Sequence, residues 1–110
     1  MKRAKRILTV CEGGNVRSVG LAYALKSHGV DAIAASWRFN TKHTLNMLYR
    51  WADYIVVLQD EMKQHIPKMY QKKLRVMDVG PDRYGSAFHP ELQGHFHAYM
   101  LEWQQREFEL

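Results

Sequence analysis

The sequence has little cysteine and no long apolar run. Cys11 is the one cysteine among 110 residues, so no disulfide can form within the chain, which is typical of a protein of the reducing cytoplasm. No apolar stretch approaches the ~20 residues that a membrane helix needs. The basic segment 1–6 precedes only a short apolar run, 7–11, too short for the core of a secretory signal. We therefore expect a cytoplasmic protein without a membrane partner.

Acidic residues are outnumbered, with 11 Asp and Glu against 16 Lys and Arg and a net charge of +5. This balance favours an anionic partner, whether a phosphoester, a nucleic acid or an acidic protein, although solvated basic patches would give the same balance. No nucleic-acid motif or aromatic row accompanies the basic residues, so we expect no nucleic-acid partner.

The six histidines do not form a metal-binding motif. His95 and His97 fall two positions apart on a predicted helix, where they do not share a face, and a second cysteine is lacking. We expect no metal site and no other cofactor.

The apolar pattern predicts one α/β domain over residues 1–110. Apolar residues make up 46% of the chain and charged residues 25%, as in ordinary globular domains. Four nearly continuous apolar runs predict strands buried on both faces. These runs are 7–10, 30–35, 54–58 and 74–77. Helical patterns separate the runs, so we expect a four-stranded parallel sheet flanked by helices on both faces.

The predicted helices have recognisable ends. Gly29 should close a first helix over 17–28, and a second should precede the third strand with Leu45 on its apolar side. Asp60 should cap a third, up to about residue 66, where Pro67 should kink or restart it, and Pro90 should begin the last. Ligands of parallel sheets bind beyond the carboxyl ends of the strands, so the loops after the four runs are the candidate site.

The loop after the first strand carries the strongest chemical pattern. It runs through Cys11, Glu12, Gly13, Gly14, Asn15, Val16, Arg17 and Ser18. Five residues between Cys11 and Arg17 suffice to surround a tetrahedral anion with backbone N–H groups, two of them from glycines. The start of a helix adds partial positive charge, and the guanidinium can hold two oxygens.

This pattern predicts a phosphate-binding loop, residues 12–18, around the nucleophile Cys11. The positive surroundings favour the thiolate, and Ser18 can donate a hydrogen bond to it. Two alternatives stay open. Cys11 could be an inert buried cysteine beside a glycine turn, or the loop could bind anions without catalysis.

Segments 10–18, 51–58 and 80–85 resemble the low-molecular-weight protein tyrosine phosphatases, particularly short members from bacteria and their phages. The resemblance covers about residues 7–92. It implies a four-stranded parallel sheet and metal-independent hydrolysis of phosphomonoesters through a phosphocysteine. It also implies that Asp82 is the general acid, in the place of an Asp-Pro-Tyr-like loop with Arg83 instead of proline. The alternatives are an ordinary turn at Asp82, or Asp78 as the acid.

The loop departs from the pattern of these phosphatases at several positions. Gly14 replaces the usual asparagine and Asn15 follows it, while Val16 and Val19 replace a second cysteine and a proline. Glycine can adopt the left-handed geometry of the asparagine without help. Glu12 would repel phosphate if it pointed inward, so we expect it to point outward.

Three aromatic residues are candidate walls of a substrate pocket. Trp37 and Phe39 follow the second strand, and Tyr84 lies beside the predicted acid. Trp37 and Phe39, with Tyr84 opposite, could enclose an aromatic group such as phosphotyrosine, or one or both of the first two could cover the core.

The sequence thus predicts a phosphatase for phosphotyrosine proteins or small aryl phosphates, with inorganic phosphate or sulfate as loop ligands. The alternative is a phosphate- or phosphoprotein-binding module without turnover. An arsenate reductase on the same fold would need a resolving thiol from outside the chain.

Overall fold

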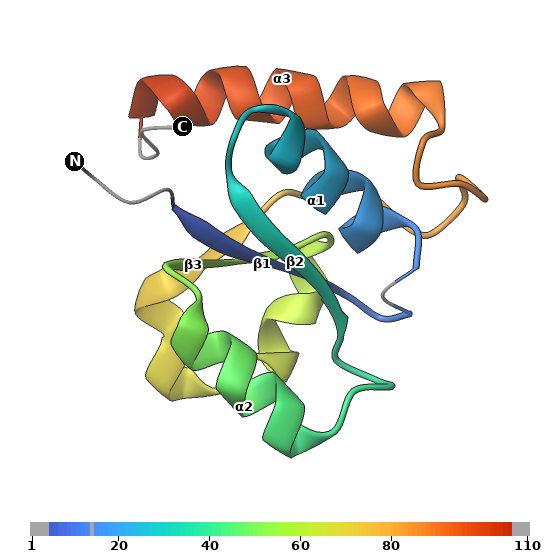
Figure 1. The fold of residues 1–110 in the computed structure, drawn as a ribbon. Coiled ribbons are helices and arrows are strands. Elements are labelled where there is room, and N and C mark those ends of the chain that lie inside the picture. The colour runs from blue at the N-terminus through green and yellow to red at the C-terminus, as the bar shows by residue number, and fades with distance from the viewer. Residues whose placement is uncertain (1–4, 14, 107–110) are drawn as a thin grey trace.

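Four parallel strands form one sheet in the computed structural model, which describes residues 5–13 and 15–106 (Figure 1). The strands are β1 (Arg6–Cys11), β2 (Asp31–Ser36), β3 (Tyr54–Val57) and β4 (Leu74–Val76). Their order across the sheet is β2-β1-β3-β4, and each neighbouring pair is parallel. All four carboxyl ends therefore lie at one edge, with the end of β1 between those of β2 and β3. The predicted sheet is confirmed.

Helices cover both faces of the sheet (Figure 1). α1 (Arg17–Ser27) and α3 (Pro90–Arg106) pack together over one face. α2 (Lys42–Trp51) lies on the other face with two short 3-10 helices, η1 (Asp60–His65) and η2 (Lys68–Lys73). The predicted fold class, a parallel sheet between two helical layers, is confirmed.

β1 is the centre of the core. Its apolar residues Ile7, Leu8 and Val10 are completely buried, because α1 and α3 cover one face of the strand while the other helical layer covers the opposite face. Thr9 is also completely buried, and its hydroxyl donates a hydrogen bond of 2.7 Å to the carbonyl oxygen of Ser18. This bond attaches the first turn of α1 to the strand before it.

The predicted helix ends can be compared with those of α1 and η1. Gly29 ends α1 as predicted: its φ is +79°, and its amide donates to the carbonyl of Lys26 while that of Val30 donates to Leu25, a Schellman motif. The helix expected after residue 60 is wrong in type, because it forms two 3-10 turns divided at Pro67, which has no N–H to continue the first.

Asp60 also does not cap this segment. Its own amide instead donates a 3.0 Å hydrogen bond to the Asp78 carboxylate, so the start of η1 is tied to the loop after β4.

Gly20 marks the closest approach of α1 to the segment before α3. A Cβ atom at this position would lie 2.6 Å from the carbonyl oxygen of Ala87 and 3.0 Å from the ring of Phe96. Gln93 closes the same contact, since its side-chain amide donates to the carbonyls of Gly20 and Ala87. Only glycine fits here without moving backbone.

We predict that Gly20→Ala lowers the free energy of unfolding by about 1–3 kcal/mol, because the new methyl group overlaps a carbonyl oxygen that cannot rotate away. Gly94→Ala is the matched control on α3, where a Cβ would meet no atom within 4 Å. It should raise stability by about 0.5–1 kcal/mol through helix propensity alone. Urea unfolding midpoints measure both, and equal effects of the two substitutions would contradict the close packing of α1.

Candidate active site

Cys11 is the last residue of β1 and its side chain is buried, with 2% exposed. Its Sγ lies 3.0 Å from Oγ of Ser18, and the thiol donates this hydrogen bond. When the thiol has lost its proton, the same hydroxyl can donate to the sulfur. Because Thr9 of β1 binds the backbone of Ser18 in α1, the strand and the helix together hold the Cys11 sulfur and the Ser18 hydroxyl at this distance.

Arg17 opens α1 and is buried, with 3% exposed. Its Nη1 donates to the side-chain oxygen of Gln59 at 2.8 Å and to the carbonyl of Gly80 at 2.9 Å. Both partners are neutral, and its Nε is buried with no hydrogen-bond partner among the described residues. A buried charge without a counter-charge is costly, so this guanidinium favours an anion at the end of β1.

Among residues 5–13 and 15–106, no side chain caps the first amides of α1. Val16 is the N-cap residue, it makes no capping hydrogen bond, and the first turn contains no acidic residue. These amides and the helix dipole can therefore act on a bound anion. Val16 itself packs against the core.

Glu12 and Asn15 of the predicted phosphate loop have side chains outside the core. Glu12 pairs with Arg38 at 2.9 Å between Oε1 and Nη1, so its carboxylate lies beside the loop after β2, as expected from the sequence. Asn15 is exposed. Gly13 has space for a Cβ and no positive φ, and Gly14 lies outside the described residues.

Two hydrogen bonds to backbone carbonyls attach the loop after β2 to the Cys11 loop. The Ser36 hydroxyl donates to the carbonyl of Glu12, and the amide of Trp37 donates to the carbonyl of Cys11 at 3.2 Å. The same hydroxyl accepts the amides of Arg38 and Phe39 within its own loop. A change in one loop is therefore transmitted to the other.

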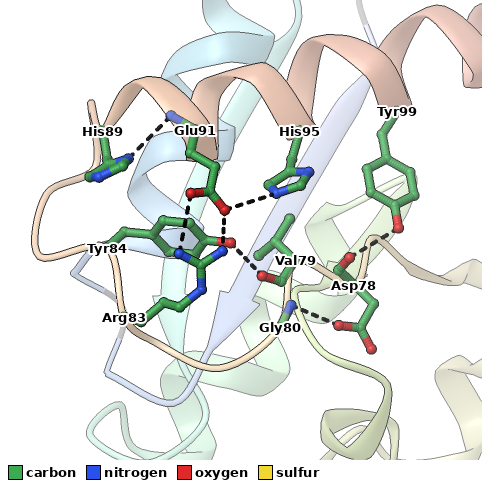
Figure 2. A network of polar contacts seen from close by, with 9 residues as sticks. All are labelled: Asp78, Val79, Gly80, Arg83, Tyr84, His89, Glu91, His95 and Tyr99. Atoms are coloured by element: carbon green, nitrogen blue, oxygen red, sulfur yellow. Dashed lines mark hydrogen bonds and ion pairs between the residues drawn. The ribbon is translucent and has the colours of Figure 1, made fainter.

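The loop after β4 is held at several points (Figure 2). The Asp78 carboxylate accepts the amide of Gly80 at 2.8 Å, and the Asp78 carbonyl accepts the hydroxyl of Tyr99. Further along, the Arg83 guanidinium pairs with the Glu91 carboxylate of α3. Because Gly80 also binds Arg17, this loop, α3 and the Cys11 loop form one connected unit.

The hydrogen bond from Arg83 lowers the pKa of Glu91, and the same bond raises the pKa of Arg83. A carboxyl whose pKa is lowered by folding stabilises the fold at pH above its ordinary pKa. That contribution is lost as the pH falls through the lowered value. The attachment of this loop to α3 is therefore weakened in acid.

Two aspartates of this loop have different surroundings. Asp78 uses both carboxylate oxygens, one for the amide of Gly80 and one for the amide of Asp60. Asp82 is exposed, and the described residues give its side chain no hydrogen bond or ion pair. Both carboxylate oxygens of Asp78 therefore bind backbone amides of this region, while the carboxyl of Asp82 lies at the surface.

The three aromatic pocket candidates do not come together as a sandwich. Tyr84 is buried, with 5% exposed, and its hydroxyl donates to the carbonyl of Val79 (Figure 2), so it belongs to the core and the expectation that it lines a pocket is wrong. Phe39 is 71% exposed beneath the Arg38 guanidinium. Trp37 is half-buried and stacks on His65, with ring centroids 3.6 Å apart.

Sequence reasoning missed Gln59, which holds Arg17, and His65, which supports Trp37. Gln59 follows β3 at the carboxyl edge of the sheet, so the rule for parallel sheets identifies its loop. Nothing in the sequence indicates which side chain of that loop reaches Arg17.

No protein-family model and no curated protein matches the chain, but solved structures do. A low molecular weight protein tyrosine phosphatase from Streptococcus pyogenes superposes with a TM-score of 0.65 at 17% identity, over 94% of this chain and 93% of that one. The YwlE arginine phosphatase from Geobacillus stearothermophilus gives 0.61 at 16%, over 94% and 98%. The tyrosine phosphatase Wzb from Escherichia coli K30, in complex with phosphate, gives 0.59 at 15%, over 91% and 99%.

The chain has the fold of the low-molecular-weight protein tyrosine phosphatases. The resemblance noted in the sequence is thereby confirmed at the level of fold. The similarity covers nearly the whole length of both chains, so the phosphatase fold is present here without large missing parts.

The described residues contain no group of three or more His, Cys, Asp or Glu side chains that could hold a metal ion. In the same part of the chain, no helix combines the length and apolar character needed to cross a membrane.

We predict that the Glu12–Arg38 pair controls the affinity of the loop for phosphate. Arg38→Met should weaken phosphate binding about fivefold, because a released Glu12 carboxylate repels the anion by roughly 1 kcal/mol. The double variant Glu12→Gln/Arg38→Met should restore the original affinity. Isothermal titration with inorganic phosphate measures both, and equal losses in the single and double variants would show that Arg38 acts in some other way.

Proposed function

We propose that the protein is a cysteine-dependent phosphomonoester hydrolase that acts through a phosphocysteine on phosphotyrosine proteins or small aryl phosphates. The observation that carries this proposal is the pairing of buried Cys11 with Ser18 next to Arg17, whose Nε lacks a partner among the described residues. The phosphatase fold supports it.

In the first step, the Cys11 thiolate attacks phosphorus while the bond from phosphorus to the ester oxygen breaks. The leaving oxygen takes a proton from the Asp82 carboxyl. Arg17 and the first amides of α1 stabilise the charge on the remaining phosphoryl oxygens, which is the main electrostatic contribution to such a transfer.

In the second step, water attacks the phosphocysteine and gives a proton to the Asp82 carboxylate. The bond between sulfur and phosphorus breaks, which releases phosphate and the thiolate. The Ser18 hydroxyl, at 3.0 Å from the sulfur, can donate a hydrogen bond to the departing thiolate and so make it a better leaving group.

Phosphate binding without turnover is the second candidate function. Asp82 favours it, because no described residue orients its carboxyl, and a general acid must be positioned at the leaving oxygen. The same loop would then retain a phosphorylated partner instead of releasing phosphate.

We predict that Cys11→Ser abolishes hydrolysis of p-nitrophenyl phosphate and keeps phosphate binding. Serine preserves the size and polarity of the side chain but is a far weaker nucleophile at neutral pH. Initial rates measure the first effect and isothermal titration the second. Vanadate should inhibit the unmodified protein. Turnover by Cys11→Ser would exclude the phosphocysteine, and absence of turnover in the unmodified protein would favour the binding module.

We predict that Asp82→Asn slows hydrolysis of alkyl phosphates and phosphotyrosine by about 10²- to 10⁴-fold, the usual contribution of a general acid. It should affect p-nitrophenyl phosphate much less, because nitrophenolate leaves without a proton. Asp78→Asn is the matched control and should lower the unfolding midpoint instead, since it weakens the bonds to Gly80 and Asp60. The slope of log kcat against leaving-group pKa decides between them. An unchanged slope in Asp82→Asn would make Asp78 the next candidate.

A further inference from the structure

A cavity of about 360 Å³ lies beside the candidate active site on the α2 side of the sheet. Its apolar lining comes from Leu45 and Tyr49 of α2 and from Pro67. Its volume falls in the range of pockets that hold small ligands or single large side chains. Nothing in the two-step hydrolysis uses this space.

Trp37 and His65 form one wall of the cavity. Their rings stack with centroids 3.6 Å apart and planes 6° apart, which gives a flat and rigid surface. The indole Nε1 of Trp37 is buried without a hydrogen-bond partner among the described residues. A buried donor without an acceptor is rare in folded proteins and indicates a place for one.

Each ring of this wall belongs to a segment that begins at the candidate active site. The amide of Trp37 donates to the carbonyl of Cys11. On the other side, η1 begins directly after Gln59, which binds Arg17 at 2.8 Å, and ends at His65. The cavity is therefore next to the place where a substrate would present its phosphoryl group.

The polar lining is basic or neutral. Lys42 and Asn46 lie along α2 near its start and join His65 at the cavity. None of the described lining residues is acidic. This combination of an apolar interior with basic side chains fits an apolar group that belongs to an acidic molecule.

We propose that this cavity is a substrate subsite that binds a bulky apolar side chain adjacent to the phosphorylated residue of an acidic phosphopeptide. A role of this subsite in catalysis rests on the proposed function, whereas its preference for a bulky apolar side chain does not. Trp37 would separate the two subsites, with the phosphoryl group on the Cys11 side and the apolar side chain against Leu45 and Tyr49.

The test compares two acidic phosphotyrosine peptides that differ only in the residues on either side of phosphotyrosine, both Phe or both Gly. Dissociation constants are measured with Cys11→Ser protein, which does not consume the peptides. We expect the Phe peptide to bind on the order of tenfold more tightly, as burial of one aromatic side chain allows.

Asn46→Trp, added to Cys11→Ser, should remove this preference, because an indole at this exposed position fills the space beside Leu45. Met47→Trp is the matched control. Met47 is the next residue of α2, is 48% exposed and does not line the cavity, so the preference should survive. Equal affinities for the two peptides, no binding of either, or a preference that persists in Asn46→Trp would overturn the subsite.

The outcomes separate this proposal from the proposed function. A preference for the Phe peptide without turnover by the unmodified protein would support the subsite and refute the hydrolase. Turnover of p-nitrophenyl phosphate without any preference between the peptides would do the reverse.

Discussion

The carboxyl edge of the sheet depends on one buried guanidinium. Arg17 begins α1, and its Nη1 joins the loop after β3 through Gln59 and the loop after β4 through Gly80. These neutral acceptors orient the side chain without cancelling its charge, and its Nε has no acceptor among the described residues. A carboxylate partner would have satisfied the arginine and closed the proposed anion site. The buried charge is therefore left for the phosphoryl group that the proposed function requires.

Asp78 and Asp82, the two aspartates of the loop after β4, have different surroundings. Asp78 binds the amides of Gly80 and Asp60, so it fixes the backbone that contacts Arg17. Asp82 lies on the exposed part of the same loop, where its carboxyl takes no part in these bonds. This loop is in turn attached to α3 through the ion pair of Arg83 and Glu91 (Figure 2). The position of the candidate acid Asp82 therefore depends on a helix that follows later in the chain.

The sheet and the ends of its strands were predictable from the sequence, because apolar runs such as 7–10 and 54–58 are long enough to specify buried strands. The loop between Cys11 and Arg17 was predictable as a candidate site because its residues are consecutive and lie directly between a strand and a helix. The 3-10 turns after Asp60 were not predictable. Whether a six-residue segment forms α-helical or 3-10 hydrogen bonds depends on neighbours far along the chain. Nor was the burial of Tyr84, whose hydroxyl finds the carbonyl of Val79 only in the folded chain. Long-range partners such as Gln59 and His65 leave no periodic signal.

Neighbouring strands hold the Cys11 loop in place. Thr9 binds the backbone of Ser18, Ser36 binds that of Glu12, and Trp37 binds that of Cys11. All three residues lie on or directly after β1 and β2, whose register pairs Cys11 with Ser36. Val16, where the resembling phosphatases usually have a second cysteine, packs against the core and precedes α1 without a side-chain capping bond. The geometry around the sulfur is therefore set by the sheet.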